Sequence, residues 1–283
     1  MEKKSKASAV AASLASMMCV QGGASVAKQL FPIVGATGTT SLRIGLSAVL
    51  LNLINRPKFW KFTKKEWMYC GLYGGSIALM NMIFYLSIQR IPLGLAVTIE
   101  FAGPLFLAIL LSRQLLDIVW AFFACIGILL IVPWQTNNID LIGLGLAATA
   151  GIFWACYIVM GSKVSKAMNT NHAVSVGLIF ATFIVVPVAI YMGGLEHLTW
   201  GSFALGAAVA VLSSALPFSL DLLALKQLPA QTFSILTSLQ PAFAALSGLL
   251  FLQEHLTLLQ WLSILCVVIA SVGTTLFSSK KDI

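Results

Sequence analysis

Charged side chains inside long apolar stretches are the residues of this sequence with the clearest chemical potential. Glu100 stands about eight residues into one stretch, and Arg43 and Lys28 stand in two others. A charge at the centre of a bilayer costs at least about 2.5–3.5 kcal/mol on insertion scales, so such groups usually face a cavity or a partner. A carboxylate can bind an ammonium group or carry a proton, and a guanidinium can hold a carboxylate through two hydrogen bonds. Together the charges suit a zwitterionic ligand.

Each charge also has a structural interpretation, which the sequence leaves open. Glu100 could pair with Arg43 or Lys28 inside the protein, and either base could extend to the nearest membrane surface. Both bases are expected toward the outer ends of their apolar stretches. Asp221 is expected near the cytoplasmic end of its stretch, where it would either pair with Lys226 or act as an inner gate.

Uncharged polar residues accompany these charges. Asn81 lies in the middle of a stretch, and Tyr85 follows one helical turn later on the same face. Segment 21–25 contains adjacent glycines and is expected to break the first stretch, which lets a ligand or a neighbouring helix approach the backbone. We predict that Glu100 carries the proton and Asp221 forms the gate. The predicted substrate-binding residues are Glu100, Arg43, Lys28, Asn81, Tyr85, Gln21, Ser25 and Gln240.

The other chemically active residues do not form the pattern of a metal site or an enzyme. His172, His197 and His255 fall in expected loops or helix ends, and the five cysteines lack metal-binding spacing. The sequence contains neither a glycine-rich phosphate loop nor a phosphorylated-Asp pump motif. We therefore predict no metal and no cofactor, and we expect an ion or substrate gradient rather than ATP to drive any transport.

The composition indicates an integral membrane protein. Of its 283 residues, 59% are hydrophobic and 9% are charged, whereas an ordinary soluble domain has about 25% charged residues. The apolar stretches are long enough for membrane-spanning helices and too long for barrel strands. We predict an all-α protein with ten spans, at 8–30, 38–55, 68–89, 92–112, 115–134, 140–162, 172–192, 200–224, 230–252 and 256–278.

Basic residues sort to one side of these spans. With both termini in the cytoplasm, only Arg90 falls in an outer loop. The net charge of +8 then reflects membrane orientation and anionic lipid, so it does not argue for nucleic acid as a partner. The bases expected at cytoplasmic ends are Lys3, Lys4, Lys6, Arg56, Lys58, Lys61, Lys64, Lys65, Arg113, Lys163, Lys166, Lys226, Lys280 and Lys281.

The two halves of the chain look related. Pro92 and Pro104 in the first half match Pro229 and Pro241 in the second, at one common offset along the chain. A repeat of five helices, an odd number, must enter the membrane from the opposite side the second time. We therefore predict inverted repeats at 8–134 and 140–278, an arrangement typical of secondary transporters with a central substrate site.

Several stretches of the sequence also carry a family resemblance. They are segment 21–28, Leu42-Arg43, the run 81–105 with FYLSIQ and EFAGPL, segment 214–220, and Pro241-Ala242. They resemble the ten-helix EamA-type members of the drug/metabolite transporter superfamily, over the whole chain. The resemblance implies an inner-membrane exporter of small neutral amino acids that depends on the proton-motive force, with both termini cytoplasmic. In the family that the chain resembles, the position of Gln240 is often Glu, so coupling here is expected to rest on Glu100 or on another route.

These observations predict a secondary exporter of threonine, homoserine or similar amino acids, working by alternating access and coupled to protons. The ammonium of the substrate would meet Glu100, and its carboxylate would meet Arg43 or Lys28. Alternatives are a broad metabolite or drug exporter of the same superfamily, and a membrane-embedded enzyme or interaction protein. The sequence leaves open whether a homodimer forms. The drug exporter would be favoured by aromatic residues in the cavity, such as Phe84, Tyr85, Phe101 and Phe218.

Overall fold

The structure is a computed structural model, and the part of the chain that it describes is built from helices. It describes residues 2–27, 30–91, 93–111, 115–131, 140–196, 198–237, 239–240, 243, 258–259, 261–262, 265–266 and 268–270. The elements are α1 (Glu2–Ala27), α2 (Phe31–Asn55), the short 3-10 helix η1 (Phe59–Lys61), α3 (Lys64–Ile88), α4 (Leu93–Leu110), α5 (Leu115–Ile131), α6 (Leu141–Ala167), α7 (Thr170–Tyr191), α8 (Trp200–Ala210), the π-helical η2 (Val211–Ala215), α9 (Leu216–Gln227) and α10 (Ala230–Thr237).

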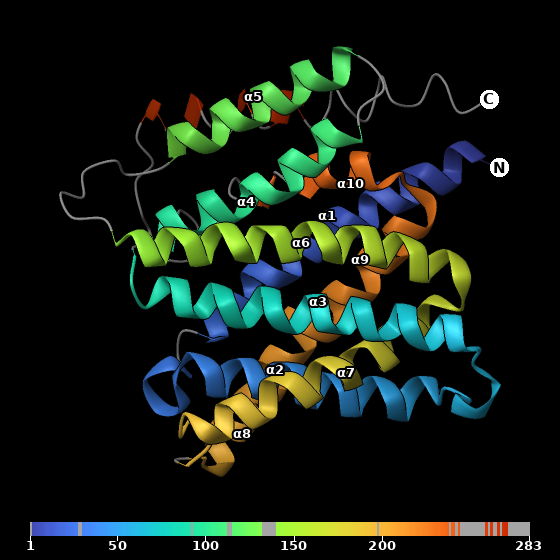
Figure 1. The fold of residues 1–283 in the computed structure, drawn as a ribbon, viewed down its shortest axis with the longest axis vertical. Coiled ribbons are helices and arrows are strands. Elements are labelled where there is room, and N and C mark those ends of the chain that lie inside the picture. The colour runs from blue at the N-terminus through green and yellow to red at the C-terminus, as the bar shows by residue number, and fades with distance from the viewer. Residues whose placement is uncertain are drawn as a thin grey trace.

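The helices run back and forth, so the turns between them gather at two opposite ends of the bundle (Figure 1). The turns that follow α2, α6 and α9 share one end, and the turns that follow α3 and α7 lie at the other. We call the first the basic end, because it holds Arg56, Lys61, Lys64, Lys166 and Lys226. The fold thus brings these five bases together, as their order in the sequence predicts.

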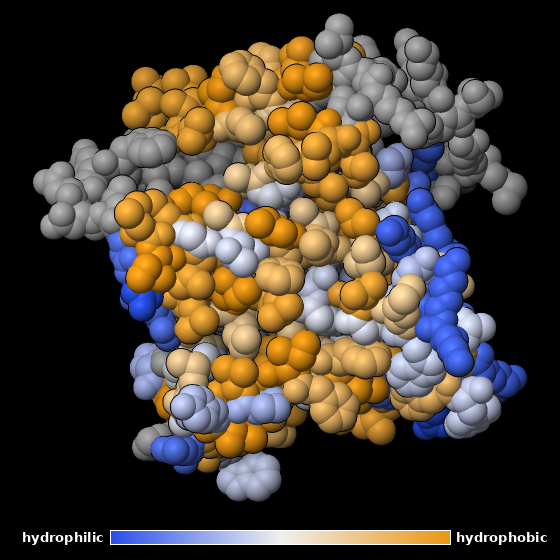
Figure 2. All heavy atoms as spheres, viewed as in Figure 1, coloured by the Kyte–Doolittle hydropathy of each residue, from blue (hydrophilic) through white to orange (hydrophobic). Residues whose placement is uncertain are grey.

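Apolar side chains cover most of the face of the bundle that Figure 2 shows, between its two more hydrophilic ends. Leu53, Phe106 and Phe183 are 68%, 61% and 74% exposed, and soluble monomers rarely expose large apolar patches of this kind. Among the described helices, five are long and apolar enough to cross a membrane. These are Pro32–Asn55, Lys64–Ile88, Leu141–Ala167, Thr170–Tyr191 and Trp200–Gln227, the last comprising α8, η2 and α9.

Polar residues at the helix starts explain where several of these helices begin. The Thr63 hydroxyl accepts a hydrogen bond from the Glu66 amide, and the Glu66 carboxylate accepts one from the Thr63 amide at 2.7 Å. Asn169 accepts the Asn171 amide at 2.9 Å at the start of α7. Such caps satisfy the first amides of a helix, which have no partner within it. The caps therefore place the ends of the apolar helices at the hydrophilic edges of the bundle.

Glycines allow two pairs of helices to touch backbone to backbone. A Cβ placed on Gly74 of α3 would lie 2.1 Å from the Gly177 oxygen of α7. A Cβ placed on Gly103 of α4 would lie 2.0 Å from the Gly151 oxygen of α6. Small residues permit this close approach in membrane helix packing. The second contact lies beside Glu100, since a Cβ on Gly151 would lie 2.6 Å from the backbone carbonyl oxygen of Glu100.

The structure corrects the prediction for the first two spans. Segment 21–25 does not break the first helix, because α1 continues through Ala27. Gly23 instead serves packing, since a Cβ there would meet the Ser213 hydroxyl oxygen of η2 at 2.0 Å, whereas a Cβ on Gly22 would meet nothing within 4 Å. The second helix begins at Phe31 rather than at residue 38, with a kink at Gly35, where φ is +65°. Arg43 is consequently near the middle of α2 and not toward its outer end.

The other predicted spans agree with the described helices to within a few residues. The eighth span corresponds to α8, η2 and α9 together, and the ninth begins as α10. Most residues of the last two predicted spans lie outside the described part of the chain. The described residues from 258 to 270 are helical.

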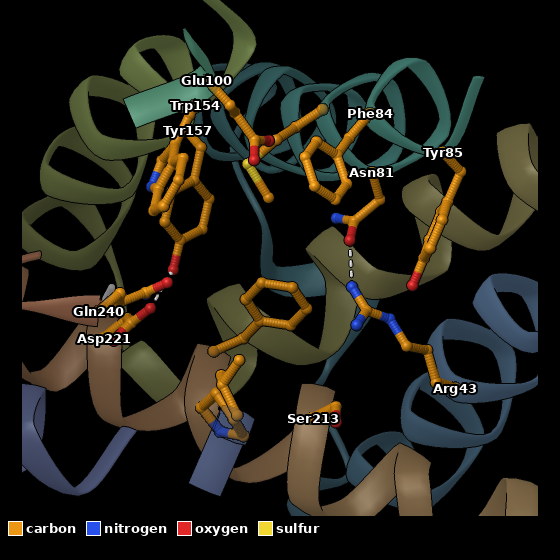
Figure 3. A pocket seen from close by; sticks show the side chains of 14 residues that line it. Arg43, Asn81, Phe84, Tyr85, Glu100, Trp154, Tyr157, Ser213, Asp221 and Gln240 are labelled. Carbon is orange, nitrogen blue, oxygen red and sulfur yellow. Dashed lines mark hydrogen bonds between the residues drawn. The ribbon is translucent and has the colours of Figure 1, made fainter. Parts of the chain in front are cut away.

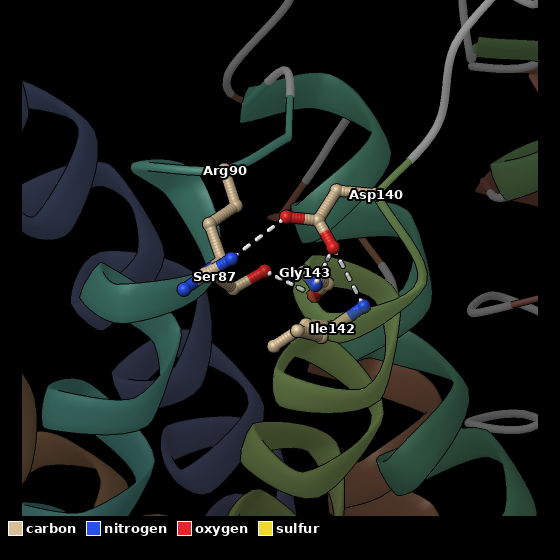
Figure 4. Close-up of polar contacts among 5 residues, drawn as sticks. All are labelled: Ser87, Arg90, Asp140, Ile142 and Gly143. Carbon is tan, nitrogen blue, oxygen red and sulfur yellow. Dashed lines mark hydrogen bonds and ion pairs between the residues drawn. The ribbon is translucent and has the colours of Figure 1, made fainter.

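A polar cluster joins α3 to α6 at the end opposite the basic end (Figure 4). Arg90 Nη1 and Asp140 Oδ2 form an ion pair at 2.9 Å, and Asp140 Oδ1 accepts the Ile142 amide at 2.8 Å and the Gly143 amide at 3.4 Å. The Ser87 hydroxyl donates to the Gly143 oxygen at 2.8 Å. The hydrogen bond from Arg90, helped by these amides, holds the pKa of Asp140 below its usual range.

Replacing Asp140 by Ala should lower the melting temperature more than replacing Arg90 by Ala, because only the first change also removes the cap of α6. A lowered pKa means that the carboxylate stabilises the fold above the usual pKa of 3.8 and loses this effect as the pH falls below that value. Thermal unfolding in detergent between pH 3 and 8 tests this. If the difference in melting temperature between wild type and Asp140→Ala stayed constant as the pH fell to 3, the prediction would be contradicted.

Candidate functional site

A cavity of about 180 Å³ lies inside the bundle, between α1, α2, α3, α4, α6, η2 and α9. It brings together five of the residues predicted from the sequence to bind substrate, and Asp221 with them (Figure 3). Both polar and aromatic side chains form its wall. The lining residues are Val20, Arg43, Met80, Asn81, Phe84, Tyr85, Glu100, Trp154, Tyr157, Ser213, Pro217, Phe218, Asp221 and Gln240.

Arg43 and Asn81 form the cationic side of the cavity. Arg43 Nη2 donates a hydrogen bond to Asn81 Oδ1, while Asn81 Nδ2 donates to the Ile77 oxygen at 2.7 Å. The second bond fixes the amide so that its oxygen faces the guanidinium. Arg43 Nε is buried and has no hydrogen-bond partner among the described residues. A buried donor without a partner is costly, so the guanidinium is suited to receive a ligand oxygen.

Glu100 enters the cavity from α4, between the two groups of labelled polar residues (Figure 3). The residue is only 7% exposed, and within the described part of the chain it forms no ion pair with Arg43. The two side chains nevertheless line the same cavity. Pro104 lies inside α4 and has no amide hydrogen to donate to the Glu100 carbonyl one turn earlier. The cavity therefore offers a carboxylate and a guanidinium to one small ligand.

Asp221 lies on the side of the cavity opposite Arg43 in this view, together with Tyr157 and Gln240 (Figure 3). The Tyr157 hydroxyl donates to Asp221 Oδ2 at 2.8 Å. The predicted pair with Lys226 is absent from the described contacts. Asp221 stands near the middle of α9, which ends at Gln227, and it lines the same cavity as Glu100.

Aromatic rings form most of the remaining wall. Tyr157 stacks on Tyr73 with ring centroids 5.4 Å apart, and it meets Phe218 edge-on at 5.9 Å. Phe84, Tyr85 and Phe218 line the cavity as the drug-exporter alternative supposes. Phe101 does not, since it is buried against Trp154 with the rings 4.5 Å apart.

Comparison with known proteins decides the family. The chain is 42% identical to the threonine/homoserine exporter RhtA of Escherichia coli K12, over 95% of this chain and 92% of that protein. It is 43% identical to RhtA of Salmonella typhimurium LT2, over 93% of this chain and 90% of that protein. The EamA-like transporter family also matches residues 141–276. The chain belongs to the EamA-like transporter family.

The fold of this EamA-like transporter has a solved counterpart. A crystal structure that is only 13% identical superposes with a TM-score of 0.78 and covers 96% of this chain and 99% of that one. At this identity the likeness concerns the fold alone. Membership in the family makes the protein a membrane transporter and not an enzyme, so the cavity is interpreted below as a transport site.

Three residues predicted for the site of this EamA-like transporter cannot be placed in the cavity. Lys28 lies outside the described residues. Gln21 and Ser25 belong to α1, but their side chains lie outside the described part of the structure. Trp154 and Tyr157 also line the cavity, although they are not among the residues predicted for the site. They stand three positions apart on α6 and therefore share one face of that helix.

Proposed function

We propose that this transporter exports threonine, homoserine and similar small neutral amino acids, in exchange for protons, by alternating access. The observation that carries the proposal is the cavity that contains both Arg43, with its buried unpartnered Nε, and Glu100. The carboxylate of the substrate would bind Arg43, held in place by Asn81, and its ammonium group would bind Glu100. The relatives in Escherichia coli and Salmonella typhimurium are named threonine/homoserine exporters, which supports this choice of substrate.

In this proposal, proton coupling arises because the proton and the substrate compete for Glu100. One carboxylate can hold either a proton or the ammonium group of the substrate, so a proton that arrives from outside would displace the substrate there. The other proposed substrate-binding residues are Lys28, Gln21, Ser25, Tyr85 and Gln240.

Alternating access requires the cavity to open on either side in turn. The Tyr157–Asp221 hydrogen bond joins α6 to α9, and these helices would have to separate if the cavity opened between them toward the basic end. This supports the proposed role of Asp221 as a gate. We further propose ten membrane spans, arranged as inverted repeats at 8–134 and 140–278, with both termini in the cytoplasm of a bacterial inner membrane.

The size of the cavity argues against the broad drug exporter. Sites for drug-sized ligands usually have about 300–1,000 Å³, whereas this cavity has about 180 Å³. Its aromatic wall is compatible with a small ligand, because it also excludes water from the charged groups. An amino acid therefore fits the cavity better than a dye or a drug.

A thermal-shift screen of the purified full-length protein tests the proposed substrate. A ligand at 100 times its Kd adds about 2.7 kcal/mol to the free energy of unfolding, so threonine and homoserine should raise the melting temperature. Threonine amide lacks the carboxylate and N-acetylthreonine lacks the ammonium group, and neither should do so. Sugars and cationic dyes serve as controls. Equal shifts with a dye or with both blocked threonines would refute a zwitterion site.

A further inference from the structure

The polar side of the cavity at Asp221 is not used by the amino and carboxyl groups of the substrate. Arg43, Glu100 and Asp221 all line the cavity, and Asp221 lies there beside Tyr157, its hydrogen-bond partner, and Gln240. Figure 3 shows Arg43 and Asp221 on opposite sides, with Glu100 between them. Arg43 and Glu100 would hold both groups on the α-carbon, so the side chain of the substrate must extend toward Asp221.

The chemistry at this position favours a hydrogen-bond donor. Tyr157 satisfies one oxygen of Asp221 at 2.8 Å, and an ionised carboxylate has about four acceptor positions in its two oxygens. Acceptor positions therefore remain on Asp221, which lines the cavity. A side-chain hydroxyl can donate to this carboxylate, an acidic side chain would be repelled by it, and an alkyl side chain would leave it unsatisfied.

We infer that Asp221 is a specificity-determining residue that accepts a hydrogen bond from a hydroxyl group on the side chain of the substrate. The cavity thereby selects hydroxy amino acids over alkyl amino acids of the same shape. This inference rests on the proposed function, because it assumes that Arg43 and Glu100 hold the α-carbon groups. It assigns Asp221 a contact with the substrate in addition to its proposed part in gating.

Two isosteric pairs of amino acids test the inference: threonine with valine, and homoserine with norvaline. Hydrogen bonds to charged groups contribute about 1.5–3 kcal/mol, so wild-type protein should bind each hydroxyl member about 10- to 100-fold more tightly. In Asp221→Asn this ratio should fall to within about threefold, mainly through weaker binding of threonine and homoserine. The measurement is a set of Kd values from equilibrium binding to the purified full-length protein. Asp140→Asn, the same change outside the cavity, should keep the wild-type ratio.

Tyr157→Phe provides a second test of the contact between Asp221 and the substrate hydroxyl, and it can be used even if Asp221→Asn does not fold. It removes the donor that competes for Asp221, so the preference for the hydroxyl member should increase. A purely gating role for Asp221 would change transport rates and leave both ratios intact. Unchanged ratios in the variants, or wild-type protein that binds all four amino acids equally, would overturn this inference alone. A wild-type protein that binds no zwitterion would defeat the proposed function as well.

Discussion

Replacing Glu100 by Gln is expected to reduce threonine efflux by about 10- to 100-fold, which corresponds to the 1.5–3 kcal/mol of a hydrogen bond to a charged group. Gln has nearly the shape of Glu, so the packing of α4 against α6 should survive. The variant can neither attract the ammonium group nor exchange it for a proton. The efflux that remains should therefore be independent of pH, whereas wild-type efflux should rise with an inwardly directed proton gradient.

The measurement is threonine efflux from loaded proteoliposomes at several imposed pH gradients. Glu66→Gln is the matched control, because Glu66 is a half-buried carboxylate outside the cavity and Gln can also serve in the capping box of α3. The control should retain both the rate and the pH dependence. Efflux from Glu100→Gln with the wild-type rate and pH dependence would remove Glu100 from the mechanism.

The second large effect concerns stability, and it should separate two adjacent glycines. A Cβ on Gly74 would lie 2.1 Å from the Gly177 oxygen and 2.8 Å from the Phe180 Cβ, whereas a Cβ on Gly75 would meet nothing within 4 Å. In Gly74→Ala, α3 and α7 must move apart, and such overpacking typically costs about 1–3 kcal/mol, occasionally more. In Gly75→Ala the helix should be as stable as wild type or more stable, because Ala favours helix by about 0.8–1.0 kcal/mol over Gly.

Thermal unfolding of both variants in the same detergent compares them directly. Both changes add one methyl group at neighbouring positions of one helix, so lipid, detergent and expression effects are shared. Gly74→Ala should melt well below wild type and Gly75→Ala at or above it. Equal melting temperatures for the two variants would show that the α3–α7 contact is looser than the structure indicates.

The sequence predicted the polar half of the cavity because a charge in an apolar helix has few acceptable positions. Glu100, Arg43 and Asn81 were found in this way, and all three line the cavity. The sequence could not identify Trp154 and Tyr157. An aromatic residue in an apolar helix looks the same whether it faces lipid, another helix or a cavity, and Phe101, predicted for the cavity, is instead buried against Trp154.

The predicted start of the second helix at residue 38 is wrong, because Pro32 lies in the first turn of α2 and Gly35 kinks the helix without ending it. The Thr-rich start of α2 is helical, since Thr39 and Thr40 donate to the Gly35 and Ala36 oxygens of their own helix, at 2.8 and 3.0 Å. Hydroxyls satisfied in this way can lie within an apolar helix. Arg43 was therefore assigned too shallow a position. The adjacent glycines of segment 21–25 do not break α1 either, and Gly23 lies against η2, because small residues serve contacts between helices as well as breaks.

The π-helical turn η2 has a consequence for any insertion or deletion in this region. Such a turn holds one residue more than an α-helical turn, and each residue of an α-helix rotates the chain by about 100°. Removing one residue from Val211–Ala215 would restore uninterrupted α-helix and swing Asp221 about a quarter of a revolution around the axis of α9. The carboxylate would then leave Tyr157, so this stretch should tolerate point changes far better than changes in length.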